Sequence, residues 1–311
     1  MTMPFETIGS PLMWAGFIAF VIAMLAIDLG VFHRKAHEVT MKEAAAWSVV
    51  WVGLAILFNL GLYQFVGPQL ALEFTAGYLI EKALAVDNIF VFVIIFSAFA
   101  IPPQYQHRVL FWGVLGALIM RAIFILLGGA LLAKFHWMIY VFGGILFITG
   151  IKLLRQNHET FDPKANILVR AFRKLMPVTD ELHGDKFLVR QAGKWVATPL
   201  MMALVAVEFT DLIFAVDSIP AIYAVTDDPF IVFTSNIFAI LGLRSLYFLL
   251  AGLIHKFAYL KTGLAFVLLF VGFKMLLMGV YKVPIIASLG VIVLILGASI
   301  VVSILRPPPS K

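Results

Sequence analysis

Apolar residues along the chain are gathered into stretches of about 20 positions, separated by polar breaks. A helix of about 20 residues crosses a hydrocarbon core of about 30 Å, so each stretch has the length of a membrane span. Hydropathy and the breaks predict helices over 11–32, 44–66, 72–99, 108–133, 137–155, 198–226, 230–254, 261–280 and 284–305. The pattern therefore predicts an all-α fold, a polytopic membrane helix bundle of about nine transmembrane helices.

The composition favours a membrane as the solvent. Hydrophobic residues make up 62% of the chain and charged residues 13%, whereas soluble domains average about 45–50% and about 25%. The chain has no cysteine, which excludes disulfides, thiolate ligands and cysteine nucleophiles. The net charge of +6 is spread over several loops, so no nucleic-acid partner is expected. The first stretch has no leading basic region or cleavage site, so we interpret it as a retained helix.

Lysine and arginine residues gather in the loops that follow odd-numbered predicted helices. They include Arg34, Lys35, Lys42, Arg108, Lys256 and Lys261, together with the basic residues of the long polar interval 156–197. The positive-inside rule then predicts an N-terminus outside and a C-terminus in the cytoplasm. We interpret the interval 156–197 as a solvated cytoplasmic loop rather than a folded regulatory module.

A short acidic pattern occurs twice. Ala85-Val86-Asp87-Asn88-Ile89 lies in the third predicted helix, and Ala215-Val216-Asp217-Ser218-Ile219 lies in the sixth. Six positions before each shared aspartate stands another carboxylate, Glu81 in the first copy and Asp211 in the second. The following helices keep the same order, with Arg121 matching Arg244 and Gly150-Ile151-Lys152 matching Gly272-Phe273-Lys274. This order predicts a duplicated unit of three helices.

Three crossings reverse the direction of the chain, so a tandem duplication of three helices places its copies in opposite orientations. Such inverted repeats are the recurring architecture of secondary transporters, which bind substrate near the midplane where the copies meet. The predicted organisation is 1–71 for two N-terminal helices, 72–155 for the first repeat, 156–197 for the cytoplasmic loop, 198–280 for the second repeat in inverted orientation, and 281–311 for the last helix and a short tail.

Five carboxylates lie well inside predicted spans, where each charge costs at least about 2.5–3.5 kcal/mol. They are Glu81, Asp87, Glu208, Asp211 and Asp217. Lys82, Arg121 and Arg244 are the charge-balancing cations, and three cations do not neutralise five acids. A bound divalent cation or protons would supply the missing positive charge.

The spacing of the acids limits how they bind an ion. Residues six apart lie about 120° around and about 9 Å along a straight helix. Either the helices unwind near Asp87 and Asp217, or an ion takes one carboxylate from each repeat, with Asp87 and Asp217 as the favoured pair. Asn88, Ser218 and Asn236 are auxiliary ligand candidates. Oxygen ligands select Mg²⁺, Ca²⁺ or Mn²⁺, and the histidines lie in loops or at helix ends, which disfavours zinc.

Three strings carry a resemblance to a known family. They are Glu81-Lys82-Ala83-Leu84-Ala85-Val86-Asp87-Asn88, the run from Val207 to Pro220, and Thr234-Ser235-Asn236-Ile237-Phe238-Ala239-Ile240-Leu241-Gly242-Leu243-Arg244. On these strings the chain resembles the TerC family, most closely its Alx-type members, over nearly its whole length. The resemblance implies a bacterial inner-membrane protein related to LysE-superfamily exporters, with Mn²⁺ as the exported ion and the five acids as its site.

The predicted function is a secondary transporter that exports a hard divalent cation, most simply Mn²⁺, by alternating access, with protons as a candidate counter-ion and no prosthetic group. An alternative is a membrane stress-response scaffold that binds soluble partners through its cytoplasmic loop, its acids serving structural ion pairs. An enzyme is not expected, because the predicted spans offer no histidine to activate a serine and no glycine-rich aspartyl motif.

Overall fold

The computed structural model describes residues 7–32, 39–135, 137–155, 167–191, 193–251, 259–281 and 283–305. The described chain is predominantly helical, with one small β-hairpin. Its elements are α1 Pro11–Phe32, α2 Met41–Phe65, α3 Pro68–Ala98, α4 Pro103–Lys134, α5 Met138–Arg155, α6 Ile167–Leu175, β1 Leu188–Gln191, β2 Lys194–Ala197, α7 Pro199–Tyr223, α8 Pro229–Leu241, α9 Leu243–Ala251, α10 Leu260–Leu276 and α11 Ile285–Leu305.

Every range predicted to span the membrane contains helix, but the seventh range is divided. There α8 and α9 are bent by 42° relative to each other across Gly242. In the described chain, five helices are long and apolar enough to cross a membrane, namely α2, α4, α5, α7 and α11, and the bent pair counts as a sixth. The multi-pass membrane character is confirmed, whereas nine crossings stay a prediction.

Helix starts follow local chemistry. Proline stands at the first turn of α3, α4, α7 and α8, where its missing N–H costs nothing and its fixed φ suits a helix. The Thr40 hydroxyl caps α2 by accepting from the Glu43 N–H. The Asp228 carboxylate caps α8 and also accepts from the Thr7 hydroxyl and the Ile8 N–H. This cap therefore ties the N-terminal segment to the middle of the chain.

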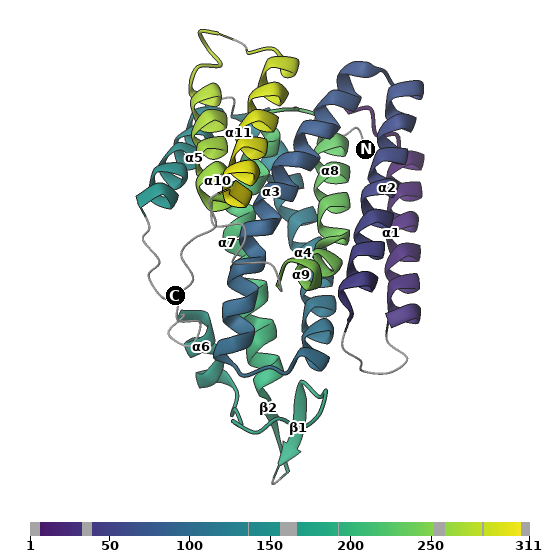
Figure 1. Cartoon of the computed structure of the whole chain (residues 1–311), viewed down its shortest axis with the longest axis vertical. Coiled ribbons are helices and arrows are strands. Elements are labelled where there is room, and N and C mark those ends of the chain that lie inside the picture. Colours follow the sequence, from purple (N-terminus) through teal and green to yellow (C-terminus); the bar gives the residue numbers. More distant parts are fainter. Residues whose placement is uncertain are drawn as a thin grey trace.

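Helices α3, α4, α7 and α8 form the middle of the molecule, with α1 and α2 along one edge and α5, α10 and α11 along the other (Figure 1). Both α3 and α4 contact both α7 and α8, and α5 packs closely on α10. The helices of the two predicted repeats are thus interleaved. Large apolar side chains such as Phe92, Phe96 and Phe238 fill the core around them.

Small residues bring the backbones of α5 and α10 into direct contact. A Cβ at Gly143 would lie 3.0 Å from the Gly272 carbonyl oxygen, and one at Gly272 would lie 2.8 Å from the Gly143 carbonyl oxygen. Further along, a Cβ at Gly150 would lie 3.0 Å from the Ala265 carbonyl oxygen. In the repeat alignment Gly150 matches Gly272, and Gly143 matches Ala265. Swapping each residue for its match therefore turns the Gly143–Gly272 contact into the Ala265–Gly150 contact. A two-fold relation requires this reciprocity, although the inverted repeat as a whole stays a prediction.

The solvated-linker interpretation of the long interval is wrong for its described part. Helix α6 buries Val169, and the antiparallel β1–β2 hairpin is joined to Val178 through a bridge at Ala197. An ion pair between Arg108 and Asp185 connects this segment to α4. Each strand has only four residues. An alternation of hydrophobic and polar positions over so short a stretch cannot be distinguished from loop sequence. The segment lies at the lower end of the molecule in Figure 1.

Candidate cation site

A cluster of polar side chains is buried where α3, α4, α7 and α8 meet. Glu81 from α3 is 0% exposed, Arg121 from α4 is 1% exposed, and Asp211 from α7 is 2% exposed. Ser218 from α7 and Asn236 from α8 are also buried. Two carboxylates that the sequence places 130 positions apart, in equivalent places of the two predicted repeats, are therefore brought into one site.

Arg121 is the centre of this cluster. Its Nη2 donates to Asp211 Oδ1 at 2.8 Å and its Nε donates to Asp211 Oδ2 at 3.2 Å, which is the two-pronged geometry that guanidinium groups form with carboxylates. Its Nη1 donates to Glu81 Oε1. The same nitrogen lies 3.2 Å from Ser218 Oγ and 3.4 Å from Asn236 Oδ1. One side chain of α4 thus connects α3, α7 and α8.

The cluster is not fully satisfied. Among the described residues, Glu81 Oε2 and Asn236 Nδ2 are buried without a hydrogen-bond partner. A buried polar atom without a partner costs about 1–3 kcal/mol, and more when it is charged. A structure keeps such atoms for a reason, and an absent ligand is one of the recognised reasons.

Lys82, predicted to balance charge, is directed to the end of α8. Its Nζ donates to the Ala239 carbonyl oxygen at 3.0 Å and lies 5.7 Å from the Tyr78 ring centroid. A Cβ at Gly242 would lie 2.9 Å from this Nζ, so the glycine leaves room for the lysine at the helix break. Lys82 interacts with the neighbouring Glu81 through charge alone.

Glu208 and Asp217 lie on α7 but face other neighbours, and both are half-buried. The Glu208 carboxylate rests against the backbone of Gly116 on α4, where a Cβ would overlap it. Asp217 Oδ1 accepts from the Thr149 hydroxyl of α5 at 3.0 Å, and Lys152 of α5 acts on it through its charge. Asp217 is therefore separated from the Arg121 cluster by the helix face it occupies. Glu208 stands one turn before Asp211 on nearly the same face and acts on Asp211 through its charge.

Asp87, Asn88 and Arg244 are the remaining predicted site residues. Asp87 and Asn88 lie in the middle of α3, where Asn88 is buried, while the side chain of Asp87 lies outside the described residues. Arg244 is buried and lines a small pocket with Trp47, Trp51 and His107. The pairing of Asp87 with Asp217 stays a prediction.

The alternative of unwound helices is wrong. Helix α3 continues through Asp87 and α7 continues through Asp217 to Tyr223, even though Pro220 stands inside it. Pro220 has no N–H to donate to the Val216 carbonyl oxygen, yet α7 continues for three residues beyond it. Among the side chains that the structure describes, no three of His, Asp and Glu gather closely enough to hold a metal ion. In this arrangement the Arg121 guanidinium fills the space between the two buried carboxylates.

Three contributors to this region carry no signal in the acidic pattern. Thr149 supplies a hydrogen bond to Asp217, Gly116 makes room for Glu208, and Lys274 is buried in α10 at 7% exposure. Lys274, which the duplicated pattern matches with Lys152, lies inside the bundle and interacts with the charge of Glu73. Only the spatial neighbours reveal these roles.

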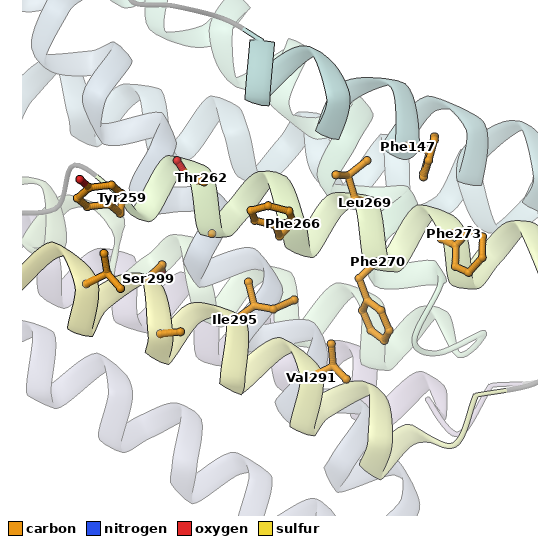
Figure 2. A pocket seen from close by; sticks show the side chains of 13 residues that line it. Phe147, Tyr259, Thr262, Phe266, Leu269, Phe270, Phe273, Val291, Ile295 and Ser299 are labelled. Atoms are coloured by element: carbon orange, nitrogen blue, oxygen red, sulfur yellow. The ribbon is translucent and has the colours of Figure 1, made fainter.

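A cavity of about 640 Å³ lies away from the acids, between α5, α10 and α11 (Figure 2). Its lining is mainly aromatic and aliphatic, with Phe266, Phe270 and Ile295 among the residues drawn. None of the four predicted acids whose side chains the structure describes lines it. The cavity is therefore not part of the candidate cation site.

Apolar helices of membrane length around a buried arginine and two carboxylates define a polytopic membrane protein with a charged centre. The chain belongs to the TerC family of integral membrane proteins, whose model matches residues 66–310. It is 59% identical to an uncharacterized membrane protein of Myxococcus xanthus, covering 97% of this chain and 95% of that protein. It is 49% identical to the putative membrane-bound redox modulator Alx of Escherichia coli K12, covering 96% of each. No solved structure matches the chain.

Proposed function

We propose that this TerC-family protein is a secondary transporter that exports a hard divalent cation, most simply Mn²⁺, through its buried carboxylates. The observation that carries the proposal is the convergence of Glu81 and Asp211 on one point inside the bundle, at 0% and 2% exposure. Charged groups inside membrane spans are expensive, and they are typical of ion and substrate pathways. Two such groups from different helices are a natural clamp for a cation.

The atoms around this point suit a hard ion. Carboxylate oxygens of Glu81 and Asp211, the Ser218 hydroxyl and the Asn236 amide oxygen all lie within hydrogen-bonding reach of the Arg121 side chain. Carboxylate, hydroxyl and amide oxygens are the ligands that Mg²⁺, Ca²⁺ and Mn²⁺ prefer. The choice of Mn²⁺ among these three comes from the family resemblance alone.

Asp87, Glu208 and Asp217 extend the acidic path along α3 and α7 on either side of the centre. The reciprocal contacts of α5 with α10 support an inverted repeat, and inverted repeats support alternating access by the movement of one half against the other. Carboxylates that release protons when metal binds make proton exchange the proposed coupling.

The proposed setting is the bacterial inner membrane, with the N-terminus outside and the C-terminus in the cytoplasm. The basic loop residues support this orientation through the positive-inside rule. A relation to LysE-superfamily exporters belongs to the same proposal.

The E. coli relative is named a putative redox modulator. A redox role that uses side-chain thiols is not open to these 311 residues, because they contain no cysteine. An exporter would change the metal supply of the cytoplasm and so connect to redox balance indirectly.

The test is Mn²⁺ uptake into proteoliposomes containing the wild type, Glu81→Gln or Asp211→Asn, with Asp185→Asn as the control. Asp185 is a half-exposed carboxylate that pairs with Arg108 outside the bundle centre. We expect Glu81→Gln and Asp211→Asn to lose at least about tenfold in initial rate, equivalent to about 1.4 kcal/mol, while Asp185→Asn transports normally. Equal rates in all four proteins would reject the site.

A second candidate function is a scaffold that docks soluble partners on the segment 167–198. The segment is folded, and it exposes Leu175 at 84% and Trp195 at 59%. Deleting residues 156–197 separates the two functions. Full Mn²⁺ transport by the deleted protein would argue against a required scaffold role.

A further inference from the structure

We propose that Arg121 is a tethered cation that occupies the Glu81 and Asp211 carboxylates in the metal-free state, and that the transported ion binds by displacing it. This inference rests on the proposed function and deepens it. It assigns to one side chain the control of both affinity and release.

Arg121 already occupies the oxygens that a metal ion would need. The guanidinium binds both oxygens of Asp211 and one oxygen of Glu81, and it also reaches Ser218 Oγ and Asn236 Oδ1. A metal ion cannot use these oxygens while their lone pairs are directed at the arginine. Among the described side chains, Arg121 is the cation that holds both carboxylates.

Arg121 does not satisfy every polar atom of the cluster. Glu81 Oε2 and Asn236 Nδ2 have no hydrogen-bond partner in the part of the chain that the structure describes, although both residues are 0% exposed. A permanent structural ion pair is stable in a membrane interior only when its remaining lone pairs and protons are bonded. A site that alternates between two cations cannot satisfy every atom in each state, so an unsatisfied carboxylate oxygen fits a temporary occupant.

A divalent ion and the Arg121 guanidinium exchange at the same carboxylates. A divalent ion carries twice the charge of a guanidinium and needs no flexible side chain to be ordered, so it competes for the same two carboxylates. Once the ion leaves, the tethered arginine refills the site without a second solute entering. The metal ion binds only those molecules in which Arg121 has left the carboxylates. The smaller this fraction of molecules is, the weaker the apparent affinity for the ion becomes.

The test measures Mn²⁺ binding to detergent-purified protein from the paramagnetic resonance signal of free Mn²⁺. The proteins are the wild type, Arg121→Gln and Arg121→Lys, with Arg108→Gln as the matched control. Arg108 lies on the same helix and pairs with Asp185 outside the buried cluster. We expect Arg121→Gln to bind Mn²⁺ about tenfold or more tightly than the wild type, yet to transport it more slowly because nothing displaces the ion. Arg108→Gln matches the wild type in both.

Arg121→Lys keeps a tethered charge without the two-pronged geometry, so its affinity falls between those of the wild type and Arg121→Gln. It also carries the test if Arg121→Gln does not fold. Added guanidinium chloride at millimolar concentration, against an equal concentration of sodium chloride, weakens Mn²⁺ binding by Arg121→Gln because the free ion enters the vacated place.

The outcomes separate the two proposals. Unchanged or weaker Mn²⁺ binding by folded Arg121→Gln, or by Arg121→Lys if the former does not fold, overturns the tethered-cation role while wild-type binding and flux still support the transporter. No Mn²⁺ binding by any of the four proteins overturns both.

Discussion

Two aspartates on the same helix have different surroundings. Asp211 is fully buried and both its oxygens accept from Arg121 of α4, whereas Asp217 is half-buried and accepts from Thr149 of α5. Six positions turn a helix by about 240°, that is about 120° in the opposite sense, which directs the two side chains at different neighbours. The acids of α7 are therefore two kinds of group. One belongs to a shared charged centre, and the other is bonded to α5.

The largest expected effect breaks the shared centre. Replacing Asp211 by Ala leaves the Arg121 charge buried with only Glu81 as its counter-ion, and loss of one partner of a buried pair costs about 3–5 kcal/mol. Replacing Asp217 by Ala removes one hydrogen bond from a half-buried group and costs about 0.5–1.5 kcal/mol. Unfolding in detergent, followed by helical circular dichroism, compares the two variants. Equal losses would remove the distinction between the two aspartates.

A smaller loss of stability is expected from a substitution at the contact of α5 with α10, on the side of the bundle where Asp217 binds Thr149. A Cβ at Gly272 would lie 2.7 Å from the Phe147 backbone nitrogen, so Gly272→Ala forces α5 and α10 apart. Overpacking of this kind costs about 1–3 kcal/mol. Gly144→Ala is the control, because a Cβ there meets nothing within 4 Å. The same unfolding measurement should show a loss in Gly272→Ala alone, and a harmless Gly272→Ala would mean that α5 and α10 do not touch as described.

The smallest effect concerns one hydroxyl. Thr149→Val keeps the shape of the side chain but removes the donor to Asp217, at a cost of about 1 kcal/mol. In the Asp217→Ala background the same substitution should cost much less, since its partner is already gone. A double-mutant cycle measured by unfolding gives this coupling. A coupling of zero would show that the bond does not contribute to stability.

The sequence predicted the helical bundle, whereas the pair of acids that it favoured, Asp87 with Asp217, is not the pair that Arg121 joins. Helix positions follow from apolar stretches, and the matching of Glu81 with Asp211 follows from the duplicated pattern. That Arg121 binds both carboxylates was not predictable, because Arg244 has the same place in its own repeat. Which of the two arginines reaches the carboxylates depends on how α4, which carries Arg121, packs against α7. It also depends on the break between α8 and α9, the helix that carries Arg244. The folded segment 167–198 was missed because its apolar positions are few and its strands short.

The most direct measurement of the central claim is the anomalous X-ray scattering of manganese in crystals of the protein grown with Mn²⁺. We expect a manganese peak about 2.0–2.6 Å from oxygens of Glu81 and Asp211, the range for hard cations, with the Arg121 side chain turned away. An Mn²⁺-loaded protein whose manganese lies elsewhere, with Arg121 still bound to both carboxylates, would contradict it.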